Sequence, residues 1–344
     1  MASSVRTLPC VRFQPLPPQL IFANLDEDRK REYDAFVPVP EIMDRNGDPA
    51  PGIVTTNTFI NDLVELGDQI YFTHGGALKS VSVFGGTVTT VASSTNSYRL
   101  ATDATNIYWV EQGATNSGDA SIKKLTVSSG ALTTLASGLT SAGVNNSKIY
   151  SDGTNVYFVA RDLAATGLAI RKIQVNASSG TPTDVVSAGS LTTSNAPNFL
   201  LNGGFLYYRD FTANTISRLP TGGGAAVQLT VAGHAGKYFA MDGTTLYFSD
   251  GVNVKSIANA NTISAAVTPT TVISGSTTIY DLAVDGSYLY VQYSATLRRY
   301  NVSDFSTFAT VSAAVDQVAH SIAFDSFDVY FNENTGKIAK LPKQ

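Results

Sequence analysis

Ser151-Asp152-Gly153-Thr154-Asn155-Val156-Tyr157-Phe158 is the stretch that decides the fold, because variants of it recur along the chain. In most copies, a turn with Asp-Gly or Asn-Gly character precedes an aliphatic-Tyr-aromatic triplet. The copies occupy residues 66–72, 102–109, 151–158, 202–208, 242–248, 285–291 and 325–331. Each predicts a β-hairpin, and the unbroken apolar triplet predicts a strand that is buried on both faces.

Two further strands are predicted after the hairpin of most copies. The third strand carries a basic residue between apolar ones in most copies, at residues 78–81, 122–125, 170–173, 216–219, 254–257, 297–300 and 338–341. The fourth strand is rich in Thr and Val, which suit a half-exposed edge, at residues 89–91, 133–135, 183–185, 227–229, 270–272 and 310–311. The repeating unit is therefore a four-stranded sheet.

Seven such units average about 42 residues each from Gly52 onward, which is the spacing of propeller blades. The sequence thus predicts an all-β, seven-bladed β-propeller over residues 52–344. The seventh copy reaches the end of the sequence directly after its third strand, so we expect an N-terminal strand to complete that blade. We expect the segment Ile338 to Leu341 to pair with Ile53, Val54, Thr55 and Thr56.

The strands Ile107 to Trp109 and Leu246 to Asp250, followed by strands of the form Ile-x-Arg/Lys-Leu, resemble bacterial relatives of the YWTD-type propellers. This resemblance covers about residues 52–344. It implies a propeller architecture and a role in recognition or scaffolding, without implying a particular ligand. The animal YWTD group has six blades, and this chain has a single Trp, so it departs from that group.

Residues 1–51 differ from the rest, because they hold eight of the 13 prolines and are expected to form an extended arm. One short helix is predicted from about Leu25 to Ala35, since Asn24 has the form of a helix cap before an acidic first turn. A helix of that length is marginal alone, so Leu25, Tyr33 and Phe36 are expected to dock on a surface. We expect a protein partner or a neighbouring subunit to supply it.

Composition excludes several classes of partner. The chain is 43% hydrophobic and 15% charged, and its net charge of -4 comes with no basic run, which argues against a nucleic-acid partner. No apolar run approaches the roughly 18 residues of a membrane helix, so membrane insertion is not expected. The first twenty residues have no signal-peptide pattern, which leaves the localisation open, including a place on an exported or surface-exposed particle.

Two of the three histidines are candidate catalytic residues. His234 and His320 both precede a predicted innermost strand, which places them near one mouth of the central channel. The segment His320 to Asp325 resembles the His-Gly-Ile-Ala-Val-Asp phrase of the streptogramin lyase propellers, although their acidic metal ligands are not identified in this sequence. His74 is expected to be a solvated loop residue.

The acidic residues indicate turns rather than metal sites. Asp44 to Asp48 offers oxygen ligands for a calcium loop, but Pro49 and Thr55 occupy the positions that need Gly and Glu. Seven repeated turn residues are expected to cap the hairpins: Asp68, Asp103, Asp152, Asn202, Asp242, Asp285 and Asp325. No metal and no other cofactor is expected, and no activated nucleophile is visible.

These observations favour a non-enzymatic propeller that acts as a structural or recognition subunit of a larger assembly, anchored by its N-terminal arm. One alternative is a lyase or hydrolase that uses His320 and His234 at the channel mouth. Another alternative is a glycan-binding propeller, in which Tyr residues and Asn-rich loops such as Asn145-Asn146 supply stacking and hydrogen bonds.

Overall fold

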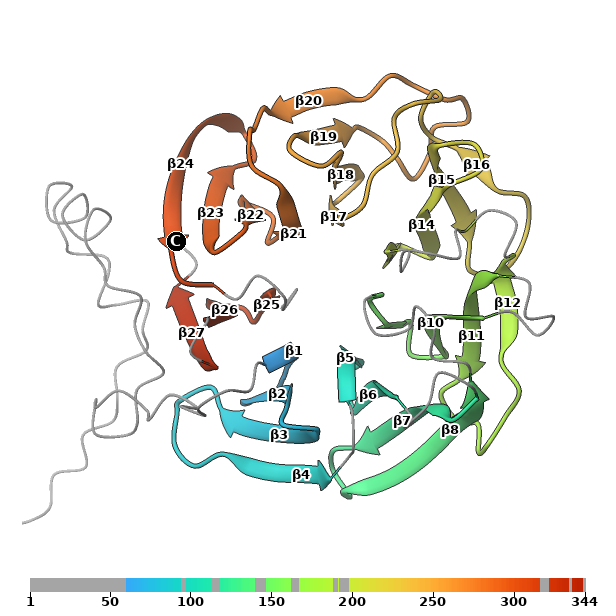
Figure 1. Ribbon diagram of the computed structural model, residues 1–344, viewed down its shortest axis with the longest axis vertical. Helices are drawn as coiled ribbons and strands as arrows, with labels where there is room; N and C mark the ends of the chain where they lie inside the picture. The colour runs from blue at the N-terminus through green and yellow to red at the C-terminus, as the bar shows by residue number, and fades with distance from the viewer. Residues whose placement is uncertain are drawn as a thin grey trace, which may run out of the picture. The chain divides into compact units, whose positions relative to one another are not determined.

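A computed structural model shows seven small antiparallel sheets arranged in a ring (Figure 1). It describes residues 60–93, 97–112, 118–139, 147–161, 167–187, 191, 198–315, 322–333 and 336–342. Each sheet is one blade of a seven-bladed β-propeller, which confirms the predicted fold class. Within the described part, no helix combines the length and hydropathy of a membrane span.

Consecutive strands in the chain are neighbours in each sheet, so every blade is a simple up-and-down meander. Blade 1 consists of β1 (Ile60–Leu66), β2 (Gln69–His74), β3 (Ala77–Ser82) and β4 (Thr89–Ser93). Blade 2 consists of β5 (Ser97–Thr102), β6 (Asn106–Glu111), β7 (Ala120–Thr126) and β8 (Ala131–Leu139). Blade 3 consists of β9 (Tyr150–Ser151), β10 (Asn155–Arg161), β11 (Leu168–Gln174) and β12 (Thr183–Val186).

The second half of the ring repeats this order. Blade 4 consists of β13 (Phe199–Asn202), β14 (Phe205–Asp210), β15 (Thr215–Pro220) and β16 (Val227–Gln228). Blade 5 consists of β17 (Phe239–Asp242), β18 (Thr245–Ser249), β19 (Val254–Ile257) and β20 (Thr270–Ile273). Blade 6 consists of β21 (Ile279–Val284), β22 (Tyr288–Tyr293), β23 (Thr296–Asn301) and β24 (Asp304–Ser312). Blade 7 shows β25 (Ile322–Phe324), β26 (Asp328–Glu333) and β27 (Lys337–Pro342).

The second strand of each blade is buried on both faces, as its unbroken apolar triplet predicts. In β6, for example, Ile107 and Tyr108 are 0% exposed and Trp109 is 2% exposed. The apolar side chains form seven clusters, and each cluster draws its members from two adjacent blades. The hydrophobic core is thus divided among the interfaces between blades, because one thin sheet cannot bury its own faces.

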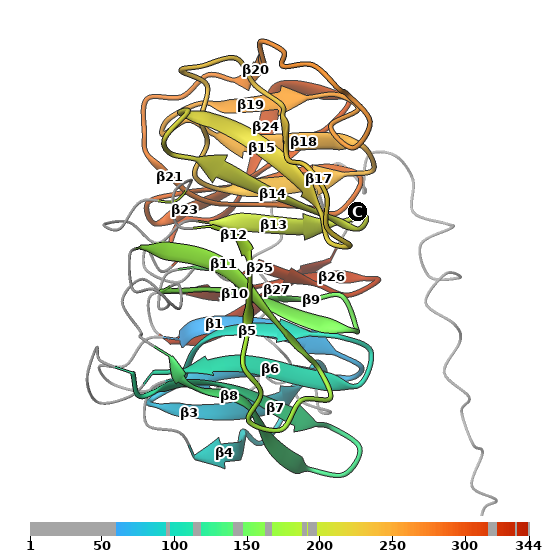
Figure 2. The same ribbon diagram turned by 90° about the vertical axis from the view of Figure 1, so that its right-hand side faces the viewer.

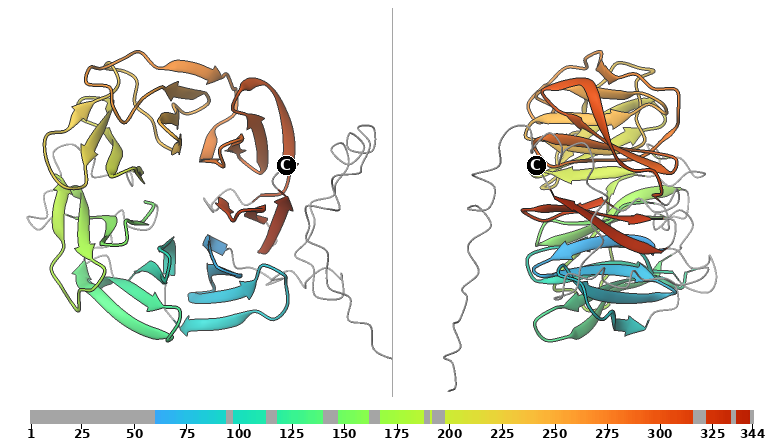
Figure 3. Two further views of the ribbon diagram at one scale, coloured as in Figure 1. Left: turned by 180° about the vertical axis from the view of Figure 1, so that it is seen from behind. Right: turned by 90° about the vertical axis from the view of Figure 1, so that its left-hand side faces the viewer.

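The ring closes where blade 7 meets blade 1, and β25 lies beside β1 in both face views (Figures 1 and 3). Tyr330 and Ile338 of blade 7 belong to the same apolar cluster as Phe72 of blade 1. The side view shows the sheets of successive blades packed face to face (Figure 2). Packing at this closing interface removes the exposed faces that an open array would leave.

The strand predicted to complete blade 7 stays a prediction. Ile53, Val54, Thr55 and Thr56 lie outside the described residues, as do the whole arm of residues 1–51 and its candidate docking residues Leu25, Tyr33 and Phe36. The other half of the predicted pairing is described, because Ile338 and Leu341 lie on β27, which pairs with β26.

The hairpins between the first and second strands use two kinds of turn. Asp103, Asp152, Asp285 and Asp325 each accept hydrogen bonds from the backbone N–H groups two and three residues later, as predicted for caps. The carboxylates of the same four also accept a hydrogen bond from the Tyr hydroxyl five residues later. We call this bond the Asp–Tyr turn contact. The other three hairpins turn through two residues that include a glycine at positive φ: Gly67, Gly203 and Gly243.

Candidate functional site: a polar ring at the centre of the propeller

The register of the innermost strands brings one polar position from each of blades 1 to 6 to the centre of the propeller. In blade 1, Leu63 pairs with Phe72 of the second strand, and the residue before it is Asp62. The same position in blades 2 to 6 follows from the corresponding pairings. We call the set the polar ring, and its described members are Asp62, Arg99, Lys148, Asn198, Tyr238 and Asp281. The seventh position, residue 321, lies outside the described residues.

An ion pair across the ring joins two blades that are not neighbours. The Lys148 ammonium donates hydrogen bonds to Asp281 Oδ1 at 2.9 Å and to Oδ2 at 3.1 Å. The Asp281 side chain is 1% exposed and that of Lys148 is 25% exposed. Asp281 Oδ1 also accepts the N–H of Leu282 at 2.9 Å. Lys148 belongs to blade 3 and Asp281 to blade 6, so this bond ties opposite sides of the propeller together.

A second set of bonds joins blade 1 to blade 2. Asp62 Oδ1 accepts the N–H of Leu63, and Oδ2 accepts the N–H of Leu100, each at 3.0 Å. Arg99 Nη1 donates to the carbonyl oxygen of Asn61 at 3.2 Å in the opposite direction. Both oxygens of the Asp62 carboxyl group are therefore occupied by backbone donors, one from each blade.

Burial shifts the pKa values of the titratable groups in and next to the ring. It raises the pKa of Asp62 to about 6, although Arg99, Lys148 and the two backbone N–H donors act in the opposite direction. Burial opposes the charge of Lys148, but Asp281, Tyr150 and Asp62 together raise its pKa above the ordinary value. Burial also raises the pKa of Tyr150 to about 12. The phenol and the ammonium therefore keep one protonation state at physiological pH, whereas Asp62 titrates close to neutrality.

The described members of the ring are largely buried and balance in formal charge. Five of its six described members are buried, and Lys148 is the half-buried one. The two acidic and two basic members balance in formal charge, and both carboxyl groups are held by hydrogen bonds. Among the described residues, no three His, Cys, Asp or Glu side chains come together in a group that could hold a metal ion.

His234, one of the two candidate catalytic histidines, is not a member of this ring. His234 Nδ1 lies 3.4 Å from Lys255 Nζ on β19, so its side chain lies beside the third strand of blade 5. His320 lies outside the described residues, and so does the loop with Asn145-Asn146.

The expectation for His74 was wrong. The residue is 3% exposed, and its Nδ1 accepts a hydrogen bond from Lys79 Nζ at 3.1 Å. Strand β2 runs two residues beyond the Ile-Tyr-Phe triplet, so His74 pairs with Ile60 inside the sheet instead of lying in a loop.

The polar ring was missed at the sequence level, although a signal for it exists. Its members in blades 2 to 6 lie four residues before the turn residue of their hairpin, as Arg99 does before Asp103. In a single copy such a residue is an isolated polar group at the start of a strand. The pattern becomes visible when the copies of blades 2 to 6 are superposed on the turn residue.

Comparison with known proteins supports the fold and leaves the family open. No family model matches the chain, and no curated protein matches its sequence, so no match confirms the YWTD resemblance. Among solved structures, virginiamycin B lyase from Staphylococcus aureus is similar with a TM-score of 0.63 and 14% identity, over 85% of this chain and 98% of that one. A chain in the mitotic checkpoint complex is similar with a TM-score of 0.56 and 12% identity, over 86% and 92%.

A third similar structure is the extracellular domain of a putative hybrid two-component system from B. thetaiotaomicron. Its TM-score is 0.60 at 11% identity, and the match covers 84% of this chain and 39% of that one. The similar structures thus include an enzyme, a chain in a multiprotein complex and an extracellular domain. At identities this low, the comparison shows a shared propeller fold and does not identify an activity.

Proposed function

We propose that this chain is a non-enzymatic β-propeller that serves as a structural or recognition subunit of a larger assembly. The polar ring is the observation that supports this proposal. Lys148 pairs with Asp281, the carboxyl groups of Asp62 and Asp281 are held by hydrogen bonds, and five of six described members are buried. A catalytic acid or base must reach the proton that it transfers, whereas these groups stabilise the ring itself.

The proposed anchor is the arm of residues 1–51, with Leu25, Tyr33 and Phe36 as its docking residues. Its support is compositional, since eight of the 13 prolines lie in it and its predicted helix is too short to be stable alone. The partner is a protein surface, either a second subunit or another component of the assembly.

Deletion of residues 1–48 tests the anchor. We expect the full chain to form an assembly and the truncated chain to be monomeric by light scattering, with an unchanged β-sheet signal in circular dichroism. Replacing Leu25, Tyr33 and Phe36 by Ser in the full chain should have the same effect as the deletion. An assembly mass that neither change alters would refute the anchoring role.

A lyase that uses His320 and His234 at the channel mouth is the second candidate, and the similarity of the fold to that of virginiamycin B lyase supports it. A similar structure is a catalytically inactive His-to-Ala variant of that lyase with quinupristin. We expect the full chain to leave quinupristin intact in a mass-spectrometric assay. Consumption of quinupristin that is lost in His320→Ala would replace the proposed role by the enzymatic one.

A further inference from the structure

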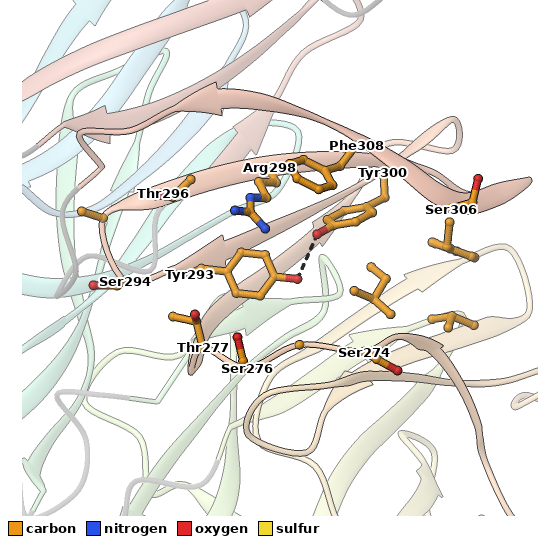
Figure 4. A pocket seen from close by; sticks show the side chains of 15 residues that line it. Ser274, Ser276, Thr277, Tyr293, Ser294, Thr296, Arg298, Tyr300, Ser306 and Phe308 are labelled. Carbon is orange, nitrogen blue, oxygen red and sulfur yellow. Dashed lines mark hydrogen bonds between the residues drawn. The ribbon is translucent and has the colours of Figure 1, made fainter.

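Blades 5 and 6 enclose a pocket of about 530 Å³ that the sequence did not indicate (Figure 4). Its walls come from three stretches of the chain: the end of β20 with the connection that follows it, the turn between β22 and β23 with β23 itself, and part of β24. The volume lies in the range of small-molecule sites. All the residues that line it belong to the described part of the chain.

One cation projects into this pocket. Arg298 is the sole charged residue in the described lining. Its guanidinium carbon lies 4.2 Å from the centre of the Phe308 ring and 5.2 Å from that of Tyr293, and Figure 4 shows the group between those two rings. Its Nε is buried and has no hydrogen-bond partner among the described residues. A planar guanidinium held in place by aromatic rings is suited to bind a carboxylate with two parallel hydrogen bonds.

The remainder of the lining combines hydroxyl groups with aromatic surface. Six Ser and Thr side chains contribute hydroxyls: Ser274, Ser276, Thr277, Ser294, Thr296 and Ser306. The hydroxyls of Tyr293 and Tyr300 are 3.2 Å apart, so one donates to the other and the acceptor keeps a free proton to donate. Phe308 remains 50% exposed although it lines the pocket. Many neutral hydroxyls next to an exposed aromatic ring match the polar edges and apolar face of a sugar.

The walls are held in place before any ligand binds. The N–H of Gly275 donates to Asn253 Oδ1 at 3.2 Å, and the N–H of Ile279 donates to the carbonyl oxygen of Gly251 at 2.8 Å. A Cβ on Gly275 would lie only 2.2 Å from the carbonyl oxygen of Val252, so the two segments approach as closely as glycine permits. A wall fixed on both sides loses little entropy when a ligand binds.

From these features we propose that the pocket binds a carboxylated saccharide, such as a uronic acid residue. Arg298 pairs with the carboxylate, the Ser, Thr and Tyr hydroxyls bond to the sugar hydroxyls, and Phe308 packs against the face of the sugar ring. The site shares no residue with the polar ring or with residues 1–51. It supplies a ligand class for the recognition role and does not depend on how the propeller is anchored.

Calorimetric titration of the full-length protein tests this proposal with three probes: methyl glucuronoside, its methyl ester and methyl glucoside. We expect the glucuronoside to bind about tenfold more tightly than the ester or the glucoside, because the last two lack the charge that pairs with Arg298. This comparison uses unmodified protein, so it does not depend on whether a variant folds. Equal affinity for the three probes, or no binding of the glucuronoside, would overturn the proposal.

Variants assign the binding to the pocket. Arg298→Met keeps an unbranched chain between the rings and should weaken glucuronoside binding about tenfold. Phe308→Ala removes the ring that packs on the sugar, so it should weaken binding of both the glucuronoside and the glucoside. Arg209→Met is the matched control, since the Arg209 guanidinium also lies 4.2 Å from a Phe ring but outside the pocket. Acetate binding as tightly as the glucuronoside, or Arg209→Met acting like Arg298→Met, would refute a saccharide site here. Deletion of residues 1–48 should leave this affinity unchanged.

Discussion

Asp62 shows how one buried residue makes the stability of the propeller depend on pH. Burial raises its pKa from 3.8 to about 6 in the folded chain. Between these values the folded state holds a proton that the unfolded chain has released. Stability from this group is therefore complete below about pH 4 and is lost as the pH rises through about 6, by about 3 kcal/mol at most.

Asp62→Asn should remove this dependence. We expect the free energy of unfolding of the natural chain, minus that of Asp62→Asn, to fall by about 2 kcal/mol from pH 4 to pH 7 in urea titrations. The variant also places an amide group between the N–H donors of Leu63 and Leu100, but the free-energy cost of this does not depend on pH and so cancels when the two pH values are compared. Asp304→Asn is the control, because hydrogen bonds from Ser306 lower the pKa of Asp304. For this variant the same difference in the free energy of unfolding should rise with pH and not fall. Parallel curves for the natural chain and Asp62→Asn would contradict the raised pKa.

At the scale of the strand and turn, the Asp–Tyr turn contact separates two kinds of hairpin. In blade 3 the Tyr157 hydroxyl donates to Asp152 Oδ2 at 2.8 Å, which ties the turn to the strand that follows it. In blade 4 the corresponding residue is Tyr207, whose hairpin has a two-residue turn. The Tyr207 hydroxyl is buried and has no partner among the described residues.

This difference predicts unequal effects of the same substitution. Tyr157→Phe should lower the free energy of unfolding by about 1–2 kcal/mol, because it removes a hydrogen bond to a carboxylate. Tyr207→Phe should have an effect near zero or a small stabilising one, because it removes an unpaired buried hydroxyl. Urea denaturation of the two variants measures both effects. The comparison is direct, because each substitution removes one hydroxyl group and leaves the aromatic ring in place. Equal losses would show that the turn contact contributes nothing.

At the scale of the whole molecule, the Lys148–Asp281 pair links blades 3 and 6 across the ring. Lys148→Met leaves the Asp281 carboxylate buried and without its cation, and should cost about 2–4 kcal/mol. Adding Asp281→Asn removes the unpaired charge and should restore part of that loss. A double-mutant cycle by urea denaturation measures the coupling. Strictly additive effects would mean that the pair does not stabilise the ring.

The sequence by itself determined the propeller, the number of blades and the placement of the strands. Each repeat carries its own local signals, such as the Asp152 turn and the buried triplet of β6, so seven copies reinforce one another. Four of the seven predicted turn caps were also readable, because a cap involves neighbours only two or three positions apart, whereas the other three hairpins turn through two residues that include a glycine. Interactions between residues close in sequence that recur in every repeat can therefore be predicted from the sequence alone.

The tertiary structure alone decided which side chains meet. Lys148 and Asp281 are 133 positions apart, and only the curvature of the closed ring brings them to 2.9 Å. The pocket around Arg298 likewise forms where two separate blades pack together, and His74 is buried because β2 extends beyond its apolar triplet. Such contacts depend on the angle between blades, which is the sum of many packing interactions, and no short segment of sequence encodes it.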